Sequence, residues 1–366
     1  MLPYWIIFIL AALVAISAGP RTLVFGDHYY KNKLDLAWIA WICILLIYIG
    51  LRWSVGGDWG SYKWSFWEMS SLDLMKVITR SSDPGFGVLQ WITGKKVLNL
   101  GYHGLNFISA LIFCYGFAKF CKSLPRPYLA LVVGLPYLVN VVAMGYMRQS
   151  IAISIAMLAI LKLFKEENAK FFFLILLAAC FHKSSIILFP LAIFVSTKNK
   201  PLIFIGVVIL VAVGYLAFVE SEIDRFLTYY IGQGYSSGGG AIRVAMLLPP
   251  AAIFILFKDR FQLSDIQKKL WLVFSYGAFP LFFAVIFLDI STTIDRIALY
   301  ALPLQLVVFS YFPDLLTKNT KIFGVLFVIL YYALVMYVWL NFANHASAWV
   351  PYENILTRLW TGEFIY

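Results

Sequence analysis

Long apolar runs separated by short polar connections dominate this 366-residue chain. An apolar stretch of about 17 to 25 residues is long enough to cross the hydrocarbon core of a bilayer as a helix. With 62% hydrophobic and 13% charged residues, the composition excludes a soluble globular domain. The sequence therefore predicts an all-α, polytopic integral membrane protein that forms a single domain over residues 1–366. Twelve candidate spans, a few of them short, lie at 4–18, 34–51, 104–120, 127–145, 147–164, 170–182, 184–197, 201–219, 242–257, 270–288, 297–312 and 322–342.

Segment 85–100 is ambiguous, because its apolar start is interrupted by Lys95 and Lys96. If the segment does not cross, alternate connections hold 17 of the 29 basic residues but only 7 of the 18 acidic ones. The positive-inside rule makes these connections cytoplasmic. We therefore expect about twelve spans, with thirteen or fourteen as the upper limit, and extracytoplasmic loops at 52–103 and 220–241. The net charge of +11 then comes from basic cytoplasmic connections, and no nucleic-acid partner is expected.

This topology places the unusual polar residues on the extracytoplasmic side. A charge at membrane depth costs roughly 2.5 to 3.5 kcal/mol on insertion scales and usually faces a cavity or a partner. We therefore expect an extracytoplasmic cavity. The residues that it would gather come from several connections: Arg52, Asp58, Asp83, His103, Arg148, His182, Lys183, Arg243, Asp289, Asp295 and Arg296.

Taken singly, each of these residues also has a structural interpretation. Arg148 can anchor a helix end by extending to the lipid headgroups. His182 and Lys183 can form an ordinary turn, and Asp295 can pair with Arg296 at a helix start. The tryptophans that follow residue 52 fit a membrane-interface belt better than a platform for sugar rings. No single residue therefore assigns a function.

Six short motifs in a fixed order are more specific together. They are Arg52-x5-Asp58-x3-Tyr62, Asp83-Pro84-Gly85-Phe86, Met147-Arg148-Gln149-Ser150-Ile151-Ala152, Phe181-His182-Lys183-Ser184-Ser185, Asp295-Arg296-Ile297-x2-Tyr300 and Trp349-x-Pro351-Tyr352. In this order and with this topology, nearly the whole chain resembles the EpsG family of Wzy-type bacterial polysaccharide polymerases. The resemblance implies a membrane glycosyltransferase that joins undecaprenyl-pyrophosphate-linked repeat units into O-antigen, capsular or exopolysaccharide. It also implies an active site at the outer, periplasmic face of the bacterial cytoplasmic (inner) membrane.

The chemistry implied by this resemblance suits the polar residues. Arg148 and Arg296 would stabilise the charge that develops on the pyrophosphate leaving group, because a guanidinium donates two parallel hydrogen bonds and stays protonated. The acceptor hydroxyl needs a base, and Asp58 and His182 are the alternatives. Asp58 can instead orient Arg52. Together with these residues we expect a substrate-binding set of Arg52, Tyr62, Asp83, Gln149, Lys183, Arg243, Asp295, Tyr300 and Tyr352.

Other functions and partners remain open at this point. The cysteines lie in apolar segments or at their ends and show no spacing typical of zinc ligands, so we expect metal-independent catalysis without a cofactor. The expected partners are the lipid-linked glycan donor and acceptor, membrane lipid, a chain-length regulator and a flippase. The alternatives are a flippase or other transporter for lipid-linked oligosaccharides, an O-antigen ligase, and a non-enzymatic scaffold. The chain shows no internal repeat of the kind common in transporters.

Overall fold

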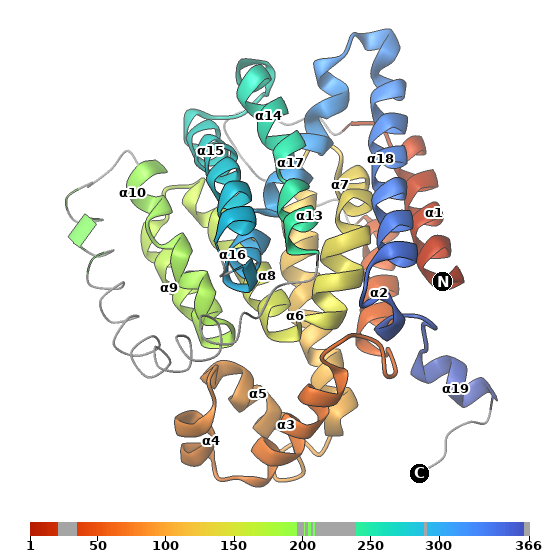
Figure 1. Ribbon diagram of the computed structural model, residues 1–366, viewed down its shortest axis with the longest axis vertical. Coiled ribbons are helices and arrows are strands. Elements are labelled where there is room, and N and C mark those ends of the chain that lie inside the picture. The colour runs from red at the N-terminus through yellow and green to blue at the C-terminus, as the bar shows by residue number, and fades with distance from the viewer. Residues whose placement is uncertain are drawn as a thin grey trace.

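The computed structural model is a bundle of helices with a smaller group of helices at one end (Figure 1). It describes residues 1–20, 35–195, 201, 204, 205, 208, 239–288 and 291–361. Every named element within these ranges is helical, and the extended backbone there forms one isolated bridge between Arg52 and Asn354. The all-α fold predicted from the apolar runs is therefore confirmed for the described part of the chain.

Most helices coincide with the predicted apolar segments, whereas the helices between residues 59 and 93 lie within the predicted loop 52–103. The first group comprises α1 (Leu2–Ser17), α2 (Leu36–Gly50), α3 (Trp59–Ser71), α4 (Leu74–Arg80), α5 (Pro84–Thr93), α6 (Gly101–Lys122), α7 (Pro127–Gly134), the π-helix η1 (Leu135–Ala143), α8 (Met147–Leu163), α9 (Asn168–Phe181), the 3-10 helix η2 (Lys183–Leu188) and α10 (Leu191–Val195).

The second group of elements completes the bundle. It comprises α13 (Gly240–Ala245), α14 (Leu248–Phe257), η6 (Lys258–Arg260), α15 (Asp265–Phe287), α16 (Ser291–Ala298), η7 (Leu299–Ala301), α17 (Pro303–Tyr311), η8 (Phe312–Leu315), η9 (Lys318–Thr320), α18 (Lys321–Phe342), η10 (Ala346–Ala348) and α19 (Ile355–Thr361). The predicted span 201–219 and the predicted loop 220–241 lie largely outside the described residues, and so does Asp289.

Four helices are long and apolar enough to cross a bilayer: Gly101–Lys122, Gly240–Arg260, Asp265–Phe287 and Lys318–Phe342. A fifth span results if Ser291–Ala301 and Pro303–Leu315, which meet at 41°, are counted as one broken helix. Other apolar helices have 10 to 17 residues. At 1.5 Å per residue they are shorter than a hydrocarbon core of about 30 Å. The described helices thus establish four or five candidate spans, and the full number of twelve stays a prediction.

The outer surface of α18 has the character of a lipid-facing helix. Phe323, Phe327, Leu330 and Leu334 recur at helical spacing and are 51–68% exposed. Side chains of this kind on one face of a 22-residue helix are unfavourable in water and favourable in hydrocarbon. The exposed apolar face supports the prediction that this chain lies in a membrane.

The helices α3, α4 and α5 form a separate group, the α3–α5 lobe, below the main bundle in Figure 1. Helix α5 has ten residues, so its length is about 15 Å. It ends at Thr93, before the lysine-containing turn that made this region ambiguous. A helix of this length does not cross the hydrocarbon core, which agrees with the expectation that segment 85–100 is not a full span.

The core of the bundle is formed by α7, η1 and α8. Every residue of α7 and η1 is buried, and so are 13 of the 17 residues of α8. Helix α8 packs against α6 on one side and α9 on the other. The approach of α6 is close because a Cβ atom at Gly116 would lie 2.4 Å from the carbonyl oxygen of Ser154. Small residues allow such close helix packing in membranes.

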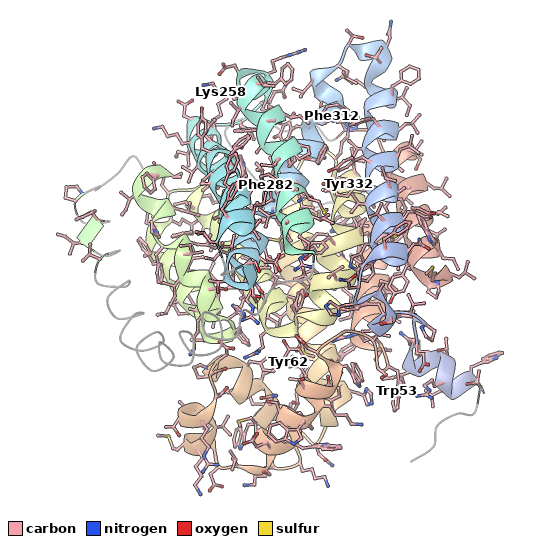
Figure 2. The ribbon with its side chains drawn as sticks, viewed as in Figure 1. Trp53, Tyr62, Lys258, Phe282, Phe312 and Tyr332 are labelled. Atoms are coloured by element: carbon pink, nitrogen blue, oxygen red, sulfur yellow. The ribbon has the colours of Figure 1, made fainter. Side chains whose placement is uncertain are left out.

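The two ends of the bundle differ in character. Lys258 lies at one end of the molecule, whereas Trp53 and Tyr62 lie at the other (Figure 2). At the Lys258 end, Arg126 pairs with Asp314, which also accepts a hydrogen bond from Lys321. Three of the basic connections predicted to be cytoplasmic, those with Arg126, Lys258 and Lys321, are therefore at the opposite end from the α3–α5 lobe.

Candidate functional site

Arg148, in the first turn of α8, lies against the α3–α5 lobe. Its Nη1 donates hydrogen bonds to Oδ2 of Asp83 (2.6 Å) and to Oγ of Ser82 (3.1 Å). Its guanidinium carbon is 5.8 Å from the centre of the Tyr62 ring. The side chain is still 36% exposed, so the guanidinium remains accessible. Arg148 is therefore held at the junction of bundle and lobe, in a position where it can contact an incoming ligand.

Asp83 precedes α5 and is buried. Burial raises the pKa of Asp83 above its ordinary value, although Arg148 and Lys183 act in the opposite direction. The start of α5 lies close to the end of α9, since a Cβ atom at Gly85 would lie 2.9 Å from the carbonyl oxygen of Cys180. This contact brings the Asp83 motif next to the motif that contains His182.

Helix α16 is attached to this region by two polar contacts. Nε2 of Gln149 donates a hydrogen bond to the carbonyl oxygen of Arg296 (2.6 Å). Asp295 forms a bidentate ion pair with Arg243 of α13, with distances of 2.9 and 2.6 Å. Because Gln149 follows Arg148 directly, its hydrogen bond brings the main chain of Arg296 close to the start of α8. Asp295, which could have paired locally with Arg296, thus forms its ion pair with Arg243, which is more distant in the sequence.

His182 lies between α9 and η2 and forms a short polar chain. Its Nδ1 is 2.6 Å from Oγ of Ser184, and Ser184 donates a hydrogen bond to the hydroxyl of Tyr300 (3.3 Å). His182 and Ser184 are half-buried, whereas Tyr300 is buried. The chain links the end of α9 to the helical segment that follows α16.

Asp58 and His182 experience the same two cations. Burial, together with repulsion from Arg148, Arg296 and Lys183, lowers the pKa of His182 to about 3. The imidazole is therefore neutral at physiological pH. Burial raises the pKa of Asp58, and Arg148 and Arg296 oppose this rise. The Asp58 carboxylate and the His182 imidazole, which can both accept a proton, are thus close enough to Arg148 and Arg296 to interact with them electrostatically.

The carboxylate of Asp58 makes no hydrogen bond or ion pair with the residues that the structure describes. It occupies the N-cap position of α3 but does not bond to the first turn of that helix. An unpaired and partly buried carboxylate is costly to maintain for folding alone. Its position favours a role in binding or in proton transfer.

Arg52 and Tyr352 lie outside this group. Arg52 is only 1% exposed and donates hydrogen bonds to the carbonyl oxygens of Ile49 (2.8 Å) and Val55 (3.2 Å). The hydroxyl of Tyr352 donates to the carbonyl oxygen of Tyr48 (2.7 Å). Both side chains therefore hold the backbone at the end of α2. The hydrogen bonds of Arg52 go to carbonyl groups, so no contact supports the alternative in which Asp58 orients Arg52.

The C-terminal segment 346–355, which we call the C-terminal brace, pairs with the connection after α2. The N–H of Gly56 donates to the carbonyl oxygen of Ala348 (2.9 Å), and the N–H of Trp53 donates to that of Glu353 (2.9 Å). In the opposite direction, the N–H of Ile355 donates to the carbonyl oxygen of Leu51 (2.8 Å). These hydrogen bonds join two parts of the chain that are far apart in sequence.

The Trp349 indole is the central contact of the C-terminal brace. A Cβ atom at Gly145 would lie 2.4 Å from the indole ring, and one at Gly57 would lie 3.6 Å from it. Gly57 directly precedes Asp58, and Gly145 lies three residues before Arg148. The indole therefore contacts both connections that lead to these two candidate site residues.

The aromatic residues of this end have different surroundings. The ring of Trp53 stacks on His103 with centroids 4.7 Å apart, and Arg358 lies 4.9 Å from the Trp53 ring centre. Trp64 and Trp67, on α3, are 67% and 60% exposed. Trp53 is thus part of a packed cluster. The interpretation as a membrane-interface belt stays a prediction for the two exposed tryptophans.

Sequence reasoning did not assign a role to Ser82, Ser184 or the glycines that receive the Trp349 indole. The two serines are next to Asp83 and near His182, so the motifs themselves carried a signal for them. The glycines carried no signal, because their importance depends on a tryptophan that is close only in the folded chain.

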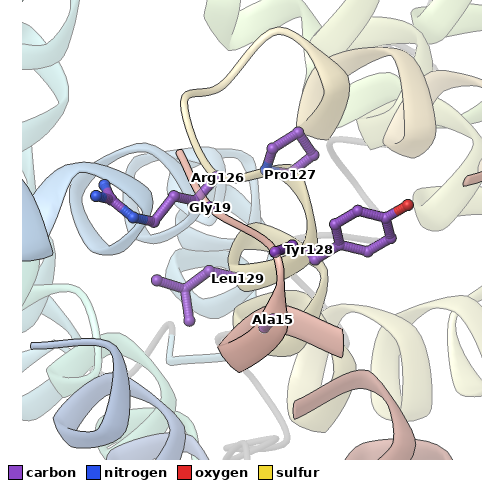
Figure 3. Close-up of a pocket in the computed structure, with 7 residues that line it drawn as sticks. Ala15, Gly19, Arg126, Pro127, Tyr128 and Leu129 are labelled. Carbon is purple, nitrogen blue, oxygen red and sulfur yellow. The ribbon is translucent and has the colours of Figure 1, made fainter. Parts of the chain in front are cut away.

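A small cavity lies between the end of α1 and the start of α7 (Figure 3). The segments that line it are the end of α1 and the start of α7: Ala15, Ala18, Gly19, Arg126, Pro127, Tyr128 and Leu129. The 8 residues of α7 and the 9 residues of η1 lie between the start of α7, which lines the cavity, and the connection that leads to Arg148. It is therefore not part of the candidate site, and the predicted extracytoplasmic cavity stays a prediction.

Within the described ranges, no group of three or more His, Cys, Asp or Glu residues is arranged to hold a metal ion. The candidate site is instead rich in arginine, with single carboxylates that are paired with arginines or stand alone. An arrangement of this kind is suited to binding an anion next to groups that can accept a proton.

Comparison with known families decides the classification. A model described as the EpsG family matches residues 35–354, which include all the candidate site residues described above. The chain belongs to the EpsG family. This EpsG assignment confirms the resemblance inferred from the six motifs and indicates a membrane protein of the polysaccharide polymerase type. Searches of curated proteins and of solved structures found no match to this EpsG chain.

Proposed function

We propose that this protein polymerises glycan repeat units that are carried on undecaprenyl pyrophosphate, at the outer face of the bacterial inner membrane and without a metal ion. The observation that supports this most is the pair of arginines, Arg148 and Arg296, whose chain segments are joined through Gln149 beside Asp58 and His182. Two guanidinium groups match a pyrophosphate in charge and in hydrogen-bonding geometry.

The arginines act on the leaving group in this proposal. The bond between the anomeric carbon of the donor glycan and the pyrophosphate oxygen breaks, and its electron pair stays with the pyrophosphate. Fixed cations in a partly dehydrated site stabilise this charge more strongly than they would in water. Arg148 is prepared for this role because Asp83 and Ser82 bind it through Nη1 only.

The acceptor hydroxyl supplies the new bond. Its oxygen attacks the anomeric carbon while its proton passes to a base, and the product is a longer glycan on one lipid pyrophosphate and a free second lipid pyrophosphate. Asp58 and His182 are the two acceptors of protons in the field of the arginines. When the pyrophosphate binds, its negative charge offsets the arginines and raises the pKa of His182, which makes the imidazole a stronger base.

Polymerisation is tested directly with the purified protein and a synthetic undecaprenyl-pyrophosphate repeat unit. We expect a ladder of glycans that differ by one repeat unit, unchanged by a chelator of divalent cations. A flippase would move the lipid between leaflets and leave its glycan length unchanged, and an O-antigen ligase would transfer glycan only to an added non-pyrophosphate acceptor. Either result would refute the proposed polymerase. A chain-length regulator and a separate flippase are the proposed partners in the cell.

The proposed orientation predicts the accessibility of two exposed positions at opposite ends of α18. In a variant whose four native cysteines are replaced by alanine, Ser347→Cys should react with a membrane-impermeant thiol reagent added to intact cells. Asn319→Cys should react only after the membrane is permeabilised, because α18 separates the two positions by about 33 Å. The opposite labelling pattern would place the candidate site on the cytoplasmic side.

A further inference from the structure

We propose, resting on the polymerase function above, that Ser184 and Tyr300 are positioning residues that fix the tautomer of His182 and leave its Nε2 as the proton acceptor. Nothing else assigns a role to Ser184. The proposal depends on the contacts along the chain His182, Ser184 and Tyr300, whose two distances are 2.6 and 3.3 Å.

The direction of the hydrogen bonds carries the argument. A serine hydroxyl has one proton to donate, and here Ser184 donates it to the hydroxyl of Tyr300. Its oxygen then faces Nδ1 of His182 with lone pairs only. A contact of 2.6 Å between these atoms is favourable when Nδ1 carries the proton and donates it to Ser184. In the neutral imidazole, the other nitrogen is then unprotonated.

The free nitrogen is the one that the reaction needs. Nε2 of His182 has no hydrogen-bond partner among the described residues, and the side chain is only half-buried. The charged groups that act on this imidazole are Arg148 from α8, Arg296 from α16 and the adjacent Lys183. Burial is the main reason that the pKa of the imidazole is lowered, and the three cations act in the same direction, so the ring is neutral while the site is empty. A neutral imidazole with a free Nε2 is ready to accept a proton.

Proton transfer can be followed atom by atom. The acceptor O–H bond breaks as its oxygen bonds to the anomeric carbon, and the proton goes to Nε2 of His182. The resulting imidazolium carries protons on both nitrogens, and Ser184 continues to accept the one on Nδ1. The imidazolium then releases the Nε2 proton to water, which restores the starting tautomer. Ser184 and Tyr300 exchange no proton in this sequence.

The tautomer can be measured without any assay of activity. The chain has four histidines, so nitrogen NMR on protein labelled at histidine in lipid gives few signals, and the His182→Gln variant identifies the signals of His182. We expect the proton of the neutral wild-type ring on Nδ1. Tyr300→Phe removes the group to which Ser184 donates, so Ser184 turns its proton toward Nδ1 and the ring shifts to the Nε2-protonated form.

Variants of Ser184 complete the test. Ser184→Ala should lower the kcat of polymerisation at least about tenfold with little change in KM, because the donor site is intact but the reactive tautomer is no longer fixed. Ser184→Thr retains a hydroxyl at this position and should preserve both the wild-type tautomer and most of the activity. A purely structural serine would leave the tautomer of His182 unchanged in Ser184→Ala, even if that variant lost activity.

The results separate this inference from the proposed function. A wild-type ring already protonated on Nε2, or a tautomer unaffected by Tyr300→Phe, would overturn the role of Ser184 and Tyr300 even if glycan ladders form. If Nδ1 carries the proton as expected but no ladder forms under any condition, the tautomer is correct and the polymerase proposal is wrong.

Discussion

Arg148→Lys is expected to form polymer at least about a hundredfold more slowly than the wild type. Lysine keeps the positive charge but cannot donate two parallel hydrogen bonds to a phosphate. It also cannot place one nitrogen on Asp83 and a second on the ligand, whereas Arg148 uses only Nη1 for its contact with Asp83. The variant should therefore lose the stabilisation of the leaving group and still insert in the membrane.

Chain length and yield are measured by gel analysis of lipid-linked glycans from cells with matched protein levels. Arg80→Lys is the control, because Arg80 is an exposed arginine in the last turn of α4 in the same lobe. The control should make chains of normal length, and Arg148→Lys should leave single repeat units on the lipid. Normal polymer from Arg148→Lys would show that Arg148 is only a helix anchor.

The second large effect concerns the base. His182→Gln should lower polymerisation at least about a hundredfold, because glutamine provides no nitrogen that accepts a proton at neutral pH. Binding of the lipid-pyrophosphate donor should be nearly unchanged, since the arginines remain in place. The two quantities are separated by measuring donor binding directly and comparing it with single-turnover rates.

Asp58→Asn is the companion variant, since the amide keeps the shape of the carboxylate and removes its charge. A loss much smaller than that of His182→Gln would agree with a supporting role for Asp58. If instead Asp58→Asn stops polymerisation while His182→Gln turns over normally, Asp58 is the base and the imidazole is not required.

The sequence predicted the helices better than their ends. The length of the apolar runs located most helical segments of the main bundle in the described part of the chain, because in a bilayer every backbone polar group must be bonded within a helix. It did not predict α3 and α4, which lie in the predicted loop 52–103. It also did not predict the π-helix η1 or the change of direction between α16 and α17. Both depend on packing against neighbouring helices, which an apolar run does not record.

The candidate site was predictable where its contacts follow the motifs. Arg148, His182 and Asp58 were identified from residue type and position, and the structure places them in one electrostatic neighbourhood. Their partners were less predictable. The pairing of Asp295 with Arg243 and the burial of Arg52 on carbonyl groups are tertiary contacts, and short-range sequence cannot rank them against a local ion pair.

The C-terminal brace has a consequence for how the protein is made. The ribosome synthesises the segments with Asp58 and Arg148 long before it reaches Trp349, yet the indole contacts the connections that lead to both. Helices inserted early in translation are therefore in the membrane before these connections have their contact with the Trp349 indole. The contact of the indole with both connections forms only after Trp349 has been synthesised and packed, so the positions of Asp58 and Arg148 are fixed at a late stage of folding.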